Sequence, residues 1–178
     1  MVAKYYRARY TRGMQLLIRV IADWLMIPIA LIAVYAFIWR VPNRARYARY
    51  CYVLMAGATS YATAKIIGLL WQPEQLRPFE LIGANPGAAY LDNPGFPSDH
   101  ALFAMFLALA VWYSTRSRRL GLVMAALAAV VCAGRVLALV HTPLDVVGGI
   151  VIACVGALWY GFDKITNTSS KMRKNVVK

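Results

Sequence analysis

The chain contains only two histidines, His100 and His141, and each stands near an aspartate where a polar segment meets an apolar one. Asp99 directly precedes His100, and Asp145 follows His141 by four positions. In a helix, this i,i+4 spacing lets a carboxylate accept a hydrogen bond from the imidazole, which fixes its tautomer and makes the other ring nitrogen more basic. Two histidines of this kind suit a nucleophile and a general acid.

Groups that bind anions accompany the histidines. Arg77 lies in the segment RPFE, Arg135 lies six residues before His141, and Ser98 precedes an apolar run. Guanidinium groups and helix N-termini are good phosphate donors. The set indicates metal-free phosphoryl transfer, in which one imidazole attacks phosphorus, the other protonates the leaving oxygen and the arginines hold the charge.

Two other interpretations use the same residues. Helix capping explains Ser98 and Asp99, and Asp145 can form a capping box with Thr142, because these residue types favour the first turn of a helix. Capping leaves both histidines and Arg135 unexplained. A zinc site could use the histidines and aspartates. The nearby arginines would repel a cation, so we expect neither a metal nor another cofactor.

The elements that must position these residues are membrane helices. The chain of 178 residues is 61% hydrophobic, and its apolar residues form runs long enough to cross a bilayer. We predict one all-helical, polytopic membrane domain over residues 1–178, with about five transmembrane helices, an interfacial segment at 1–13 and a basic tail at 164–178. The predicted helices are 14–39, 50–71, 98–114, 120–139 and 142–162, and a polar loop spans 72–97.

The first predicted helix has features of its own. Pro28 is expected to bend it. Arg19 and Asp23 are spaced i,i+4 and are expected to pair on one face.

The net charge of +13 comes largely from basic residues between and beside the apolar runs. This placement is typical of basic residues that set the orientation of a membrane protein and contact anionic lipids, rather than of residues that bind nucleic acid. The loops at 40–49 and 116–119 and the tail are predicted to be cytoplasmic, which puts the 72–97 loop and the 140–142 turn outside. Basic residues near the N-terminus oppose this orientation, so either they lie along the surface or the first run does not cross fully.

The three polar stretches, in this order, resemble the signature of the type 2 phosphatidic acid phosphatase (PAP2) superfamily, which reads K-x6-R-P, P-S-G-H and S-R-x5-H-x3-D. The counterparts here are Arg77-Pro78, the PSDH at 97–100, and GR at 134–135 followed by His141 and Asp145. The resemblance covers roughly residues 65–160. It implies a membrane-embedded lipid phosphatase that needs no metal.

The resemblance also implies roles for individual residues. His141 matches the nucleophile that forms a phosphohistidine, Asp145 the residue that orients it, and His100 the general acid. The matching phosphate cradle consists of Arg77, Ser98 and Arg135.

Three positions depart from the signature: Leu70 stands in place of the lysine, Asp99 in place of glycine and Gly134 in place of serine. Lys65, twelve residues before Arg77, could replace the missing lysine or could simply extend to the membrane surface. The Asp99 carboxylate would have to turn away from a bound phosphate or balance a cation.

The PSDH form and the weakened first motif are similar to bacterial undecaprenyl pyrophosphate phosphatases. This similarity implies hydrolysis of undecaprenyl pyrophosphate to the monophosphate, in cell wall biogenesis, at the extracytoplasmic face of the inner or plasma membrane. The expected partners are a membrane lipid substrate and the bilayer, and no nucleic acid. The sequence does not indicate an oligomeric state. The alternatives are a phosphatidic acid or phosphatidylglycerophosphate phosphatase, and a non-catalytic transporter or scaffold with a degenerate phosphate pocket.

Overall fold

The computed structural model describes residues 11–73, 76–92 and 95–163, and the regular secondary structure in these ranges is entirely helical. The helices in chain order are α2 (Arg12–Arg19), the π-helical turn η1 (Val20–Trp24), α3 (Met26–Tyr35), the π-helical turn η2 (Ala36–Arg40), the short 3₁₀ turn η3 (Asn43–Ala45), α4 (Arg46–Leu70), α5 (Pro78–Leu81), α6 (Asp99–Thr115), α7 (Arg118–Leu137) and α8 (Pro143–Gly156).

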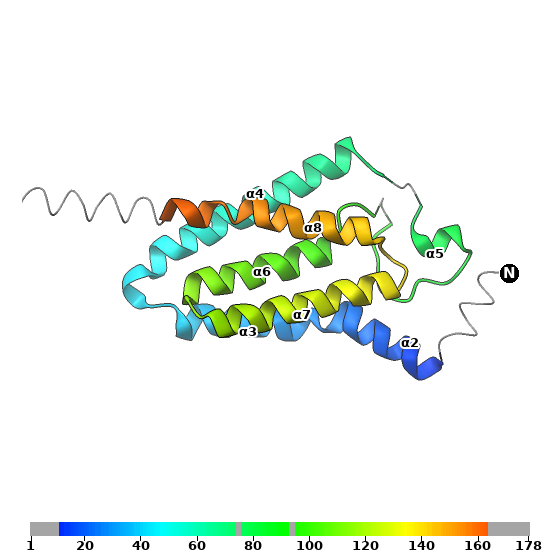
Figure 1. Cartoon of the computed structure of the whole chain (residues 1–178), viewed down its shortest axis with the longest axis horizontal. Helices are drawn as coiled ribbons and strands as arrows, with labels where there is room; N and C mark the ends of the chain where they lie inside the picture. Colours follow the sequence, from blue (N-terminus) through cyan, green and yellow to red (C-terminus); the bar gives the residue numbers. More distant parts are fainter. Residues whose placement is uncertain (1–10, 74–75, 93–94, 164–178) are drawn as a thin grey trace, which may run out of the picture.

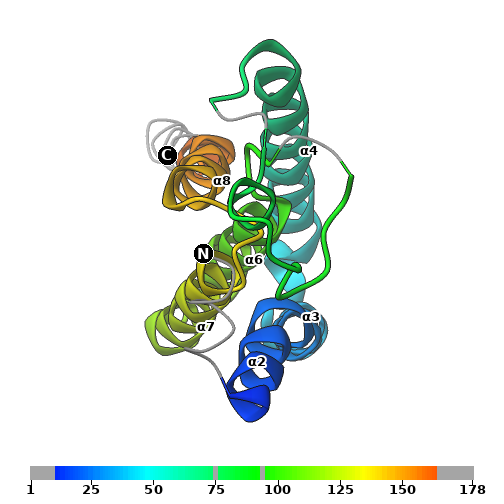
Figure 2. The ribbon, with the colours of Figure 1, turned by 90° about the vertical axis from the view of Figure 1, so that its right-hand side faces the viewer.

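The predicted helical bundle is confirmed, and α6 is its central helix. Nine of the 17 residues of α6 are buried, and α6 packs against α3, α4, α7 and α8, as the view along the bundle shows (Figure 2). Within the described residues, four helical segments are long and apolar enough to cross a membrane: Arg12–Arg40, Asn43–Leu70, Arg118–Leu137 and Pro143–Asp163. Of the five predicted helices, α6 is the one too short to belong to this group.

The observed helices agree with the predicted ranges to within about two residues, except at the start of α4 and at the end of α8, which is interrupted by a turn at 157–158 rather than running on to 162. The apolar run predicts a beginning near residue 50, whereas α4 begins at Arg46, after the turn η3. The difference has a simple cause: basic residues end an apolar run but not a helix, because arginine has a high helix propensity.

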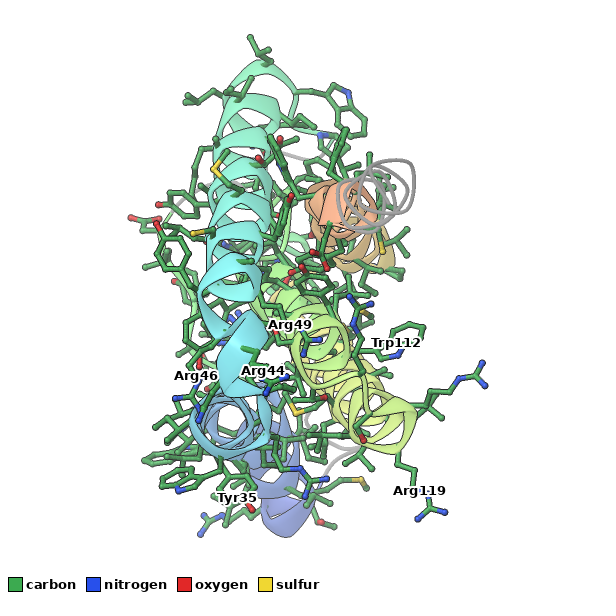
Figure 3. The ribbon with its side chains drawn as sticks, turned by 90° about the vertical axis from the view of Figure 1, so that its left-hand side faces the viewer. Tyr35, Arg44, Arg46, Arg49, Trp112 and Arg119 are labelled. Carbon is green, nitrogen blue, oxygen red and sulfur yellow. The ribbon has the colours of Figure 1, made fainter. Side chains whose placement is uncertain are left out.

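The connections between helices collect at two opposite ends of the bundle (Figure 1). One end, which we call the basic end, holds the connections at residues 40–49 and 115–119, and Arg44, Arg46, Arg49 and Arg119 gather there (Figure 3). The other end, which we call the loop end, holds the 71–98 loop and the 138–142 turn. The predicted grouping of loops is therefore confirmed. Residues 1–10 of the predicted interfacial segment and the predicted tail at 164–178 lie outside the described residues.

The first helix carries its irregularity just before Pro28. The proline ring crowds the carbonyl of the residue four positions earlier, which is Trp24, the last residue of η1. The wider π turn changes the angular spacing of neighbouring residues, so i and i+4 no longer lie above one another. The predicted pair of Arg19 and Asp23 is accordingly wrong, and Asp23 instead pairs with Arg135 of α7.

Candidate active site

A cavity of about 340 Å³ opens at the loop end, between α4, α6, the end of α7 and the connecting loops. Six of the predicted site residues line it: Lys65, Arg77, Asp99, His100, Arg135 and His141. The remaining two, Ser98 and Asp145, are buried and do not contribute to its lining. The fold thus brings together, within one hollow, side chains that are up to 76 positions apart in the chain.

His141 and Asp145 are held by the start of α8. Thr142 and Asp145 form the predicted capping box: the Asp145 backbone N–H donates to Thr142 Oγ1 (3.2 Å), and the Thr142 N–H donates to Asp145 Oδ2 (2.8 Å). The same Oδ2 lies 3.5 Å from His141 Nδ1, which is long for a hydrogen bond. Catalytic hydrogen bonds are often long before substrate binds. Because Nδ1 faces Asp145, Nε2 is the ring nitrogen left for chemistry.

The protonation state of His141 suits a nucleophile. Its side chain is only 5% exposed. Burial lowers the pKa of His141, the nearby Arg135 and Arg77 lower it further, and Asp145 acts in the opposite direction. The imidazole is therefore neutral near pH 7, with a lone pair available.

Arg77 is fixed by backbone carbonyls from two loops. Its Nη1 donates to Val140 O (2.5 Å) and its Nη2 donates to Leu91 O (3.1 Å). Its backbone N–H donates to Glu80 Oε2 (2.6 Å), so the RPFE segment begins the short helix α5. Burial lowers the pKa of Arg77, but arginine remains protonated in proteins. The guanidinium is thus a fixed positive charge in the cavity wall.

Ser98 begins α6 without capping it through its side chain. It occupies the N-cap position, and its backbone N–H donates to Asp145 O (3.0 Å), which links the start of α6 to α8. Its hydroxyl is completely buried and bonds no group in the described part of the chain. The hydroxyl is therefore not consumed by helix capping. Its role in binding phosphate stays a prediction.

Lys65 and Asp99 face each other across the cavity rim. Lys65 Nζ lies 3.1 and 3.3 Å from the two carboxylate oxygens of Asp99. The lysine therefore reaches the cavity, and the aspartate found in place of the family's glycine balances a cation. Both side chains are 44% exposed, and exposed ion pairs are weak. The ion pair therefore holds Lys65 only weakly.

Three residues that the sequence analysis did not assign to the site contribute to it. Asp23 Oδ1 lies 2.8 Å from Arg135 Nη1. Gln72 joins the end of α4 to the PSDH segment, because its Nε2 donates to Phe96 O (3.0 Å). A Cβ at Gly95 would lie 3.1 Å from Asp145 Oδ2, so this position has little room for a side chain. An acidic residue inside an apolar run is a signal of function, and the position of Asp23 in the first apolar run gave this signal.

No group of three or more histidine, cysteine, aspartate or glutamate side chains in the described ranges is arranged to hold a metal ion. Around the cavity the two imidazoles are instead interspersed with Lys65, Arg77 and Arg135. This arrangement suits an anion with several oxygens, because each cationic group can meet a different oxygen.

Comparison with known proteins gives one match. A family model described as the PAP2 superfamily matches residues 46–165, which is more than half of the chain. The matched range contains all eight predicted site residues and excludes the first helix. Neither the curated proteins nor the solved structures give a match.

Proposed function

Because the chain belongs to the PAP2 superfamily, which includes lipid phosphatases, we propose that it hydrolyses a lipid-linked phosphate through a phosphohistidine on His141. The observation that carries the proposal is that both histidines and both arginines line the same cavity. The paired histidines and buried arginines favour an enzyme over the alternative of a transporter or scaffold that retains a degenerate phosphate pocket.

The proposed reaction has two steps. His141 Nε2 attacks phosphorus, and the bond from phosphorus to the leaving oxygen breaks; this oxygen belongs to the glycerol of a phosphatidate or to the lipid phosphate of a diphosphate. His100, protonated in the presence of the bound anion, gives its proton to that oxygen. A water molecule then attacks the phosphohistidine, His100 accepts the water proton, and inorganic phosphate leaves with restoration of His141. Arg77 and Arg135 stabilise the negative charge on the equatorial oxygens in both steps, and Asp145 stabilises the His141 ring as it becomes positive.

An apolar groove supports a lipid substrate. It has a volume of about 690 Å³ and lies between η2, α4 and α6, with Tyr61 and Leu102 among its lining residues. Tyr61 is one helical turn from Lys65, and Leu102 is two residues from His100, so the groove begins close to the phosphate cavity along α4 and α6. We assign the acyl or prenyl chain of the substrate to this groove.

Filling the groove is expected to impair long-chain substrates selectively. Ala58 lines the groove and is exposed. In Ala58→Trp, we expect KM for a long prenyl diphosphate to rise by about 10-fold, because about two methylenes, worth about 0.8 kcal/mol each, lose their contact. A short, water-soluble prenyl diphosphate should be affected less than about 2-fold. Steady-state phosphate release with the two substrates measures the difference.

The control for this variant is Leu122→Trp, which places the same ring at an exposed position on α7 outside the groove. It should leave both KM values unchanged. An equal rise of KM for the long and the short substrate in Ala58→Trp would show that the chain does not use the groove.

Undecaprenyl pyrophosphate is the specific substrate that we propose first. A diphosphate carries more negative charge than a phosphomonoester and favours additional cations, and Lys65 supplies one beside Arg77 and Arg135. The resemblance of the PSDH segment to bacterial undecaprenyl pyrophosphate phosphatases supports the same choice. Phosphatidic acid and phosphatidylglycerophosphate, with the same chemistry, are the second choice.

We further propose that the cavity faces the extracytoplasmic side of the cell membrane. Arginines lie at the basic end (Figure 3), whereas the cavity opens at the loop end. Positively charged loops stay preferentially in the cytoplasm. A cell-wall lipid that must be dephosphorylated outside the cytoplasm would meet the cavity there.

Phosphate release by the purified protein in detergent, with EDTA present, tests the proposed function. A long prenyl pyrophosphate, phosphatidic acid and phosphatidylglycerophosphate are supplied in parallel. We expect rapid release from the prenyl substrate. Release mainly from a glycerolipid would keep the mechanism and change the substrate. No release from any of the three by folded protein would contradict the proposal and favour the scaffold.

A further inference from the structure

Arg135 is the most buried cation of the site, and the ionic partner that it has among the described residues comes from outside the part of the chain that matches the family. The arginine is 2% exposed, and its Nη1 lies 2.8 Å from Asp23 Oδ1, with the Asp23 side chain 18% exposed. Asp23 belongs to η1 in the first helix, whereas the family match begins at residue 46. The first helix therefore supplies a charged group to a site that is otherwise built by the family domain.

Asp23 also holds the loop that carries the other arginine. Its second oxygen, Oδ2, accepts a hydrogen bond from the Ala89 backbone N–H (2.9 Å). Two residues further on, Leu91 O accepts from Arg77 Nη2 (3.1 Å). One carboxylate thus contacts Arg135 directly and Arg77 through a short stretch of backbone. Ala89 and Leu91 both line the cavity.

Gly134 makes this contact possible. A Cβ at this position would lie 2.7 Å from Ile21 Cγ2 and 3.0 Å from the Ala22 backbone nitrogen. The first helix can approach α7 this closely only because residue 134 has no side chain. The family signature has serine here, so the departure at Gly134 and the ion pair of the next residue, Arg135, have one explanation.

We propose that Asp23 is a positioning residue for catalysis: it orients the Arg135 guanidinium toward the substrate phosphate, and Gly134 provides the close approach of the first helix. Arg135 Nε is buried and bonds no group within the described ranges. Because Asp23 holds Nη1, the other guanidinium N–H groups of Arg135 remain to donate to phosphate oxygens. Their orientation is fixed before the reaction, so no rearrangement is needed when negative charge develops on the phosphate in the transition state. This inference rests on the proposed phosphatase function.

The test is a double-mutant cycle of Asp23→Asn and Arg135→Gln, measured as kcat and KM on folded protein. Asparagine keeps the size of the side chain and an acceptor for the Ala89 N–H but removes the charge. We expect Asp23→Asn to lower kcat by about 10-fold, with a change in KM below about 3-fold, because the arginine acts mainly on the transition state. In the Arg135→Gln background the same substitution should have no further effect.

Two further variants separate positioning from folding. Gly134→Ser restores the family residue and should lower kcat in the same way as Asp23→Asn, because it moves the first helix away from α7. Arg19→Gln removes a charge from an exposed position one turn earlier in the first helix and should leave kcat unchanged. If Asp23→Asn fails to fold, the comparison of Gly134→Ser with Arg19→Gln still tests the proposal.

The outcomes distinguish this inference from the proposed function. If the unmodified protein releases no phosphate from any lipid, the proposed function fails. If it does release phosphate, but Asp23→Asn keeps its full kcat or loses the same factor in both backgrounds, Asp23 does not act through Arg135 and this inference alone is overturned. Thermal stabilisation by orthovanadate gives a reading that needs no turnover: stabilisation should weaken in Asp23→Asn and should stay intact in Arg19→Gln.

Discussion

His141→Ala is expected to lower kcat by about a thousand-fold or more and to leave the bundle folded, because it removes the nucleophile. The expectation of intact folding has a structural reason. His141 lies in the turn before α8, and the Asp145 carboxylate still caps that helix through the Thr142 N–H when the imidazole is absent. Alanine therefore removes a reactive group without breaking the contacts that begin the helix.

Two measurements check this prediction. Phosphate release gives the rate, and brief incubation with a substrate labelled in the transferred phosphate, followed by quenching in alkali, traps the acid-labile phosphohistidine. The unmodified protein should retain label and His141→Ala should not. Unfolding in detergent provides the folding control. Retention of label by His141→Ala, or of more than about a tenth of its kcat, would assign the nucleophile to another group.

The pH profile provides an independent reading of the same residue. Burial lowers the pKa of His141, and a histidine with a lowered pKa stays neutral at pH values where an ordinary one, with a pKa of about 6.5, takes up a proton. Since only the neutral ring attacks phosphorus, the acid limb of kcat/KM that belongs to His141 should lie below pH 6.5. An acid limb at or above that value would contradict the environment described for His141.

The features that the sequence predicted well are local or depend on apolar runs. The capping box of Thr142 and Asp145 needs only a spacing of three residues, so it could be identified without knowledge of the fold. The helical bundle follows from the apolar runs, because every backbone group in a membrane must be bonded internally. The motif spacing identified five of the charged or titratable side chains that line one cavity: Arg77, Asp99, His100, Arg135 and His141.

The features that it missed depend on packing between distant segments. Asp23 was assigned to Arg19 because an α-helical spacing was assumed, and the π turn η1 removed that spacing. Its true partner, Arg135, lies 112 residues away. In the sequence, Gly134 is only a departure from the serine of the signature. In the fold, it is a residue of α7 that the first helix approaches closely, at Ile21 and Ala22. For Lys65 the sequence left two alternatives, and only the packing of α4 against α6 shows that it lines the cavity beside Asp99.

His100→Ala is expected to have an effect that depends on the leaving group. A phosphatidate releases an alkoxide, which resembles hydroxide in basicity (water has a pKa of about 15.7) and needs a proton as the bond breaks. A prenyl diphosphate releases a phosphate monoester, whose second pKa is about 6, and it can depart without a proton. We therefore expect kcat/KM to fall by about a thousand-fold for phosphatidic acid but by only about 10-fold for the diphosphate.

The choice of kcat/KM makes this comparison selective for the first chemical step. The parameter covers events up to the first irreversible step, here the departure of the leaving group, so a later role of His100 in activating water does not enter it.

The matched control is Arg77→Lys, which weakens a contact to the transferred phosphate and should reduce kcat/KM by a similar factor for both substrates. If His100→Ala also reduces both by the same factor, His100 contributes to phosphate binding and another group donates the proton. A larger loss with the alkoxide would mean that the position of His100 at the start of α6, beside a cavity that also holds His141, serves proton transfer to the lipid oxygen.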